Sequence, residues 1–116
     1  MHFEKVYIDG LGYLLPDNIV TSEEIENKLA PLYEMLKLPQ GRLELMSGIQ
    51  ERRFWDKGTL PSEVATIAGE KAITQSGVNP ENIGCLISAS VCRDFLEPST
   101  ASIIHNNLKL PVEALV

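Results

Sequence analysis

One carboxylate stands out in the segment RDFLEPSTAS, which spans Arg93–Ser102. Glu97 follows the apolar pair Phe95 and Leu96 and is followed at once by Pro98. If this loop were buried against another surface, the carboxylate would lose solvation, which raises its pKa towards working pH and suits it to act as a general base. An exposed surface loop is the alternative. Because a cis peptide bond costs little only before proline, the Glu97–Pro98 bond is a candidate for the cis form.

The two cysteines are the candidate nucleophiles. Cys85 and Cys92 lie seven residues apart without a CxxC pattern, so reduced thiols are expected, not a disulfide framework or a zinc site. Cys85 lies in an apolar run, where a small core residue is expected. Cys92 is either a packing residue or a reactive loop thiol whose pKa is lowered by the adjacent Arg93.

Arg52, in the segment ERRFWD, is the candidate anion ligand. Its planar guanidinium group can donate two parallel hydrogen bonds to a phosphate. An ion pair with Glu51 or Asp56 is the alternative interpretation. His105 has no evident partner in the sequence and is expected to be a satisfied or exposed helix histidine.

Composition narrows the class of protein. A chain of 116 residues with 44% apolar and 22% charged residues is typical of one globular domain. The net charge of −6 argues against a nucleic-acid partner, because a phosphate-binding surface needs excess Lys and Arg. No apolar run approaches the ~20 residues that span a bilayer, and MHFEKVYIDG lacks the regions of a signal peptide. A cytoplasmic location without a membrane span is therefore expected.

The N-terminal half alternates between strand and helix signals. KVYIDGLGYLLP predicts a strand that ends at Pro16, in which Gly10 and Gly12 mark a bulge or a close backbone approach. Thr21–Glu24 has capping-box spacing. Pro31 interrupts the helical pattern that follows, which predicts two short helices or a kink. Residues 37–58 are predicted to be irregular, with one turn of helix.

The C-terminal half continues the alternation. Ser62 is predicted to cap a helix that runs to about Ser76 and stops at Gly77. IGCLISAS reads as a buried central strand of the kind found in parallel sheets. Ser99 is predicted to cap a third helix, and VEALV then begins another apolar stretch. Strands alternating with helices indicate an α/β layered fold, and unpaired strand edges in it favour a dimer or higher oligomer.

Several stretches, in order, resemble a known family. YIDGLGYLLPDNIVTSEEIE, SGIQERRFW and VNPENIGCLISAS resemble 3-oxoacyl-ACP synthase III, of the thiolase superfamily. SVCRDFLEPSTASI is more closely similar to the OleA-type acyl-CoA condensing enzymes of bacterial long-chain olefin biosynthesis. The resemblance covers residues 1–116 and implies one incomplete thiolase-like α/β domain, the N-terminal part of its first repeat, with helices packed on a mixed sheet. The family's nucleophilic Cys, and its His and Asn, would lie beyond it.

The resemblance also implies an activity. OleA-type enzymes join two fatty acyl thioesters by Claisen condensation, as homodimers and without a metal or redox cofactor. It assigns Glu97 as a base that reaches the partner subunit's site, and Arg52, Phe95, Leu96 and Pro98 as substrate contacts. The carrier is either CoA or ACP. Neither cysteine of this chain occupies the nucleophile position, so these residues alone are expected to be inactive.

Two other functions stay open. The priming 3-oxoacyl-ACP synthase III, which uses malonyl-ACP, carries Phe at the position of Glu97. It also grips the CoA adenine with a Trp and an Arg, where this chain has Arg42 and Met46. The other alternative is a non-catalytic chain, either a truncated gene product or an interaction module.

Overall fold

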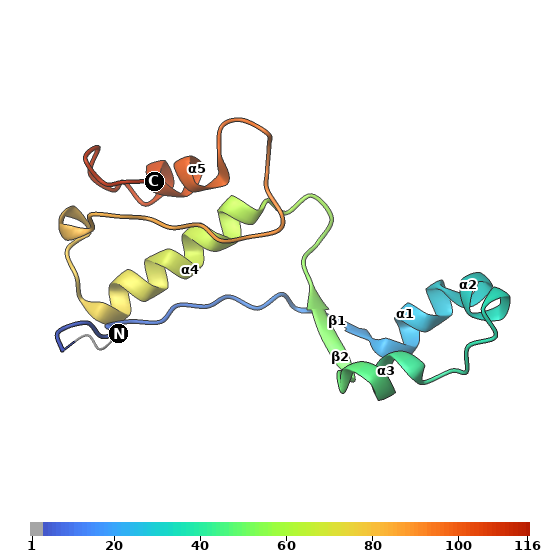
Figure 1. Cartoon of the computed structure of the whole chain (residues 1–116). Helices are drawn as coiled ribbons and strands as arrows, with labels where there is room; N and C mark the ends of the chain where they lie inside the picture. The colour runs from blue at the N-terminus through green and yellow to red at the C-terminus, as the bar shows by residue number, and fades with distance from the viewer. Residues whose placement is uncertain (1–3) are drawn as a thin grey trace. The chain divides into compact units, whose positions relative to one another are not determined.

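The computed structural model describes residues 4–116, and these divide into two compact units, Leu15–Lys57 and the residues on either side of it. Figure 1 shows the elements in chain order. They are β1 (Asn18–Thr21), α1 (Ser22–Lys28), α2 (Ala30–Met35), α3 (Arg42–Ser47), β2 (Glu51–Phe54), α4 (Pro61–Ser76), a short 3₁₀ helix (Pro80–Asn82) and α5 (Thr100–Asn107). Each unit is described by itself.

In the smaller unit, local signals place the first two helices as predicted. Thr21 Oγ1 accepts the Glu24 N–H at 3.1 Å, and the Glu24 carboxylate accepts the Thr21 N–H at 2.9 Å. This reciprocal pair satisfies two donors that a helix start would otherwise leave free. Pro31 lies in the first turn of α2, the one place in a helix that tolerates a residue without an N–H. The predicted capping box and the predicted break are both confirmed.

The segment predicted to be irregular, with one turn of helix, is more ordered than expected. It contains α3 and then β2, which pairs antiparallel with β1 in a register that sets Asn18 opposite Phe54 and Thr21 opposite Glu51. Gly41 and Gly48 flank α3 with φ of 82° and 68°, left-handed values that favour glycine. The prediction missed β2 because its pairing partner lies about thirty residues earlier in the chain, beyond the reach of a local pattern.

In the larger unit, the N-terminal segment lies along α4 at backbone distance. A Cβ built on Gly12 would lie 2.0 Å from the Ala68 carbonyl oxygen, and one on Gly10 would lie 2.7 Å from that of Ala72. The Leu11 N–H also donates to Gln75 Oε1 at 2.6 Å. The close approach predicted for the two glycines is confirmed, and it is an approach to a helix.

Two segments predicted to be strands are extended but do not pair with a neighbouring strand through a ladder of hydrogen bonds. Residues 6–16 and 83–90 form neither β1 nor β2, and their only β-pairing in the described chain is an isolated parallel bridge between Cys85 and Leu115. Around it, the Leu86 N–H donates to the Leu115 carbonyl oxygen at 2.8 Å and the Leu115 N–H to that of Gly84 at 3.0 Å. The prediction of a buried central strand is therefore wrong for the described residues, because a central strand needs neighbours on both edges.

The ends of α4 and α5 test the predicted caps. Gly77 ends α4 with φ of 69°, and Ser99 Oγ caps α5 by accepting the Ser102 N–H at 3.1 Å, both as predicted. Ser62 is not the cap of α4, because the helix begins at Pro61 and Ser62 is buried inside its first turn. His105 lies in α5, and its Nε2 is 2.9 Å from the Pro111 carbonyl oxygen, so it is the satisfied helix histidine that was expected.

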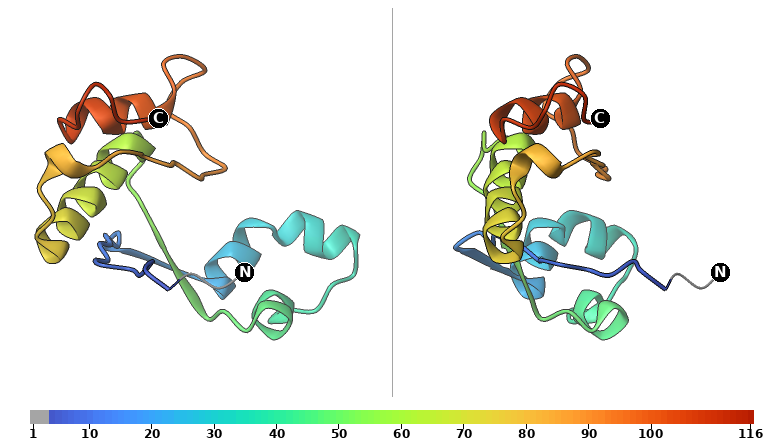
Figure 2. Two further views of the ribbon diagram at one scale, coloured as in Figure 1. Left: turned by 60° about the vertical axis from the view of Figure 1, so that its left-hand side comes forward. Right: turned by 90° about the vertical axis from the view of Figure 1, so that its left-hand side faces the viewer.

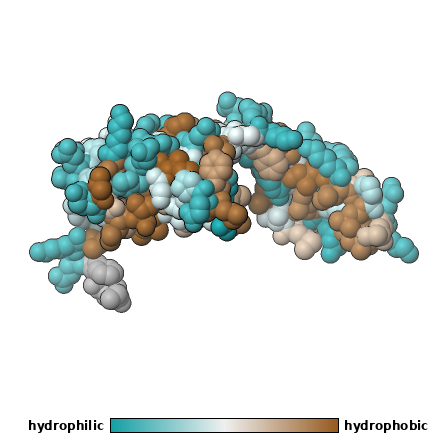
Figure 3. All heavy atoms as spheres, turned by 90° about the horizontal axis from the view of Figure 1, so that it is seen from above, coloured by the Kyte–Doolittle hydropathy of each residue, from teal (hydrophilic) through white to brown (hydrophobic). Residues whose placement is uncertain are grey.

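Apolar burial is limited in the described residues. The buried apolar side chains are Ile104, in α5, and Leu110 and Ala114, in the residues that follow it. The helix α5 packs against α4 (Figure 2). Many large apolar side chains are exposed instead, among them Val91 at 100% and Leu45 at 85%. Figure 3 shows such atoms at the surface of both units. No helix among residues 4–116 combines the length and apolar character that crossing a membrane requires.

Gly12→Ala should destabilise the larger unit. The new Cβ would overlap the Ala68 carbonyl oxygen, which belongs to a helix backbone and cannot swing aside. We expect a loss of about 1–3 kcal/mol in the free energy of unfolding, measured with guanidinium chloride on the protein expressed from the full reading frame.

Gly84→Ala is the matched control, because nothing lies within 4 Å of its Cβ position and its φ is not left-handed. It should change the free energy of unfolding by less than about 0.5 kcal/mol. Equal stabilities for the two variants would contradict the close approach.

Candidate functional site

Glu97 lies on the loop that leads into α5. The loop residues predicted to contact substrate are all exposed, with Phe95 at 50% and Leu96 at 83% of their surface open. Glu97 and Pro98 are exposed too, and the peptide bond between them is cis, the form for which the sequence made it a candidate. The loop therefore presents one carboxylate among apolar side chains.

Asp94, at the start of this loop, is a residue that the sequence analysis missed. Its Oδ1 accepts the Ser62 N–H at 3.0 Å, and its own N–H donates to Thr100 Oγ1 at 3.2 Å. Asp94 thus ties the first turn of α4 to the first residue of α5. Its Oδ2 is buried and has no hydrogen-bond partner among the described residues. No local signal could have revealed this contact, because Asp94 and Ser62 are 32 residues apart.

Arg52 lies in β2, opposite Val20, and is half-buried. Its NH1 donates to Ser22 Oγ at 2.9 Å, and the buried Ser22 hydroxyl in turn donates to the Ile49 carbonyl oxygen. Asp56, one of its predicted ion-pair partners, accepts a hydrogen bond from Asn18 at 2.7 Å. One nitrogen of the guanidinium group is therefore held, which orients the others. Arg52 belongs to the smaller unit and the Glu97 loop to the larger one.

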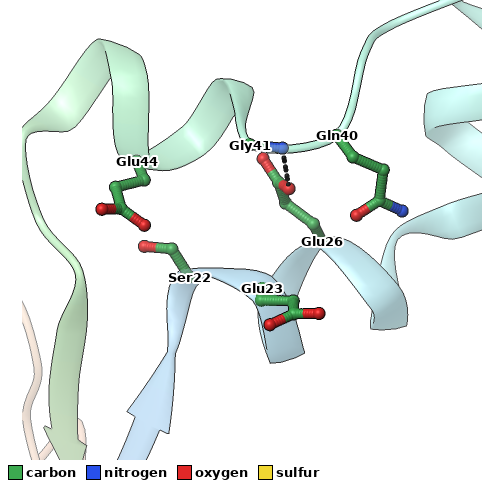
Figure 4. A pocket seen from close by; sticks show the side chains of 6 residues that line it. All are labelled: Ser22, Glu23, Glu26, Gln40, Gly41 and Glu44. Carbon is green, nitrogen blue, oxygen red and sulfur yellow. Dashed lines mark hydrogen bonds between the residues drawn. The ribbon is translucent and has the colours of Figure 1, made fainter.

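Glu26 is a second carboxylate that makes hydrogen bonds to residues distant in the sequence. It is only 1% exposed. Its Oε1 accepts the Leu43 N–H at 2.6 Å and the Tyr33 hydroxyl at 3.0 Å. Its Oε2 accepts the Gly41 N–H at 2.7 Å, the bond drawn in Figure 4. Glu26 thereby satisfies backbone donors at the start of α3, a helix whose flanking glycine has no side chain to do so.

These contacts shift two pKa values in opposite directions. The backbone donors of Leu43 and Gly41 lower the pKa of Glu26, with help from the Tyr33 hydroxyl and against the effect of burial. Burial and the hydrogen bond to Glu26 raise the pKa of Tyr33. Both effects keep Glu26 ionised and Tyr33 protonated, which are the states that the hydrogen bonds require.

The hollow beside Glu26 does not suit an acyl-CoA. It has a volume of about 330 Å³, and Glu23 and Glu44 join Glu26 in its wall (Figure 4). Three carboxylates would repel the phosphates of a CoA carrier. We therefore assign these residues to the structure of the smaller unit.

The cysteines are placed differently from expectation in one respect. Both are free, as the sequence predicted, and both are exposed. The prediction that Cys85 is a core residue is wrong for the described chain, because its segment has one bridging neighbour and no covering layer. Cys92 lies in the turn where its N–H donates to Ser90 Oγ at 3.2 Å.

Comparison with known proteins shows relatives along nearly the whole chain. It is 42% identical over 101 residues to the acyl-CoA:acyl-CoA alkyltransferase of Shewanella oneidensis and 43% identical over 108 residues to that of Xanthomonas campestris pv. campestris. These matches cover 87% and 93% of this chain but only 29% and 32% of the relatives. A β-ketoacyl-[acyl-carrier-protein] synthase III of Fusobacterium nucleatum is 30% identical over 107 residues. No family model matches the chain.

Solved structures show the same relationship. Cerulenin-bound OleA of Xanthomonas campestris superposes with a TM-score of 0.83 at 40% identity, over 93% of this chain and 31% of that one. A cysteine-to-serine variant of the same protein, with bound lauric acid and lauroyl-CoA, gives a TM-score of 0.81 at 40% identity over 93% and 32%.

The described residues therefore have the thiolase-like α/β fold of the condensing enzymes. Within that class, the chain is a homologue of the acyl-CoA:acyl-CoA alkyltransferases, the OleA proteins, and spans about a third of their length, 29% and 32% of the two alkyltransferase relatives.

Glu26→Gln should remove part of the acid sensitivity of the protein. Because the pKa of Glu26 in the folded protein is below its ordinary value of 4.5, its contribution to stability is present above about pH 4.5 and is lost as the pH falls through the folded-state pKa. The variant should be less stable than the unmodified protein at neutral pH, and the difference should shrink on acidification. Guanidinium unfolding at several pH values, on protein from the full reading frame, measures this.

The control is Glu23→Gln, one turn earlier on α1 and exposed. It should leave the free energy of unfolding close to that of the unmodified protein, both at neutral pH and on acidification. A Glu26→Gln variant whose pH profile runs parallel to that of the unmodified protein would contradict the proposed coupling.

Proposed function

We propose that the protein is an acyltransferase that joins two fatty acyl thioesters by Claisen condensation, and that residues 1–116 form the N-terminal part of its thiolase-fold domain. The observation that carries the proposal is Glu97, a carboxylate on an exposed apolar loop, in a chain 42% and 43% identical to two acyl-CoA:acyl-CoA alkyltransferases. The priming synthases that it also resembles carry Phe at this position. CoA is the proposed carrier, which agrees with the lauroyl-CoA bound to a structural relative.

In this proposal Glu97 is the base of the condensation. A cysteine thiolate of the enzyme, which is neither Cys85 nor Cys92, first takes an acyl group and releases the first CoA thiol. The Glu97 carboxylate then removes the α-proton of the second acyl thioester. The resulting enolate carbon attacks the carbonyl of the first acyl group, the new carbon–carbon bond forms, and the cysteine thiolate leaves. Glu97 could serve the same enzyme by activating the water that releases the product.

The remaining predicted site residues have supporting roles. Phe95, Leu96 and Pro98 supply apolar contacts for an acyl chain close to the carboxylate, and their exposure leaves them free to make such contacts. Arg52 would donate to a phosphate of CoA with the guanidinium N–H groups that Ser22 does not occupy. The role of Arg52 is independent of that of the loop.

The setting of the enzyme is part of the proposal. We propose a cytoplasmic homodimer or higher oligomer that acts in fatty acid metabolism on acyl-CoA. Apolar side chains exposed on both units, and extended segments without ladders, support a partner surface. The priming reaction with malonyl-ACP is the second candidate, favoured by the 30% identity to a β-ketoacyl synthase III.

Glu97→Ala, in the protein from the full reading frame, should abolish condensation of two acyl-CoAs and leave the first acylation intact. Acylation needs only the thiolate, whereas deprotonation of the second substrate needs the base; loss of a positioned base costs about 10²–10⁴-fold. Condensation is measured by product formation, and acylation by the mass of the acylated protein. Cys85→Ser is the control and should change neither rate. Condensation by Glu97→Ala at the unmodified rate would show that Glu97 is a surface residue.

The oligomeric state gives an independent check. The protein should sediment and scatter light as a dimer or larger species, because a partner subunit would bury apolar side chains that are exposed on both units. Analytical ultracentrifugation over a wide concentration range measures this. A stable monomer at high concentration would contradict the proposed assembly while leaving the chemistry open to the assay above.

A further inference from the structure

We propose that Asp94 is a positioning residue for Glu97. It attaches the loop that carries Glu97 to the N-terminal turns of α4 and α5. The inference rests on the proposed function for its catalytic consequence and on the described contacts for its structural part. No local sequence feature and no assigned role accounts for Asp94.

The loop is closed by two anchors. At its start, Asp94 is bonded through its side chain to Ser62 and through its backbone to Thr100. At its end, Ser99 Oγ accepts the Ser102 N–H at 3.1 Å as the cap of α5. The residues between the anchors, Phe95 to Pro98, are exposed and include Glu97. The direction in which Glu97 points therefore depends on what holds the two ends.

Both partners of Asp94 are buried and lie at helix starts. Ser62 is 2% exposed and lies in the first turn of a 16-residue helix, and Thr100 is 9% exposed at the first position of α5. Pro61 has no N–H and the Leu60 N–H already donates to Glu63, so Ser62 is a donor of this turn that needs an acceptor from elsewhere. Asp94 supplies that acceptor, and the positive end of the helix dipole favours its negative charge.

The buried Oδ2 indicates that Asp94 does more than fill space at this position. A carboxylate oxygen without a partner is unfavourable to bury. An apolar side chain would fill this space without that penalty, but it would leave the Ser62 N–H unpaired and would release the start of the loop. The contact to α4 is thus the feature that a carboxylate or an amide provides and an alkyl group does not.

The test compares Asp94→Ala with Asp94→Asn in the protein from the full reading frame. Asn keeps an oxygen acceptor for the Ser62 N–H, and Ala does not. In Asp94→Ala, condensation should fall by about tenfold or more, because small displacements of a catalytic group have effects of this size. The first acylation should change by less than about twofold, and Asp94→Asn should recover most of the condensation rate.

Hydrogen exchange supplies a readout that does not depend on the reaction. In Asp94→Ala, the amides of Ser62 and of the loop should exchange faster, while those in the middle of α4 should keep their protection; Asp94→Asn should resemble the unmodified protein. Unchanged loop exchange in Asp94→Ala would overturn the anchor. Equal losses of acylation and condensation, together with faster exchange throughout α4, would show a general structural role and would also overturn the proposal.

The two proposals fail in different ways. If Glu97→Ala condenses normally, or if no condensation is seen with any variant, the proposed role of Glu97 is wrong, and the exchange experiment still decides whether Asp94 fixes the loop. If Glu97→Ala is inactive and Asp94→Ala condenses at the unmodified rate, the chemistry stands and the positioning role is wrong.

Discussion

The larger unit depends on the approach of an extended segment to α4 at backbone distance. Gly12 and Gly10 make this possible because any side chain there would overlap the carbonyl oxygens of Ala68 and Ala72. The same helix accepts α5 on another face, where a Cβ on Gly69 would lie 3.0 Å from the Leu108 side chain. With such small residues, α4 acts as a rigid base against which its neighbours are placed, and the loop that carries Glu97 is fixed to its first turn.

Each unit uses a distant carboxylate to complete a helix start that its own sequence leaves open. Glu26 does this for α3 and has all its oxygens engaged, which explains its lowered pKa. Asp94 does it for α4 and leaves one oxygen unsatisfied. The contrast separates the two roles, because the first carboxylate closes a local structure completely, whereas the second holds a loop beside a candidate catalytic group.

The exposed apolar surface connects the fold to the proposed function. Few apolar side chains are buried in the described residues, and many large ones, including those of the loop before Pro98, are open to solvent. Surface of this kind marks sites of association and ligand contact. In the proposed enzyme it would be covered by further parts of a thiolase-like fold, by a second subunit and by the acyl chains of the substrate. A carboxylate that is exposed here would then work in an apolar setting.

The sequence by itself determined the features that depend on residues within one turn of each other. The capping box of Thr21–Glu24 and the helix break at Pro31 follow from local hydrogen bonding and ring geometry, and the loop with Glu97 was recognisable from its own composition. Only the tertiary structure decided which donors are satisfied from a distance. Ser62 has the residue type of a helix cap, but the chain path buries it and brings in Asp94 as the acceptor. A local pattern cannot carry this information, because a contact across 32 residues depends on how the whole intervening chain packs.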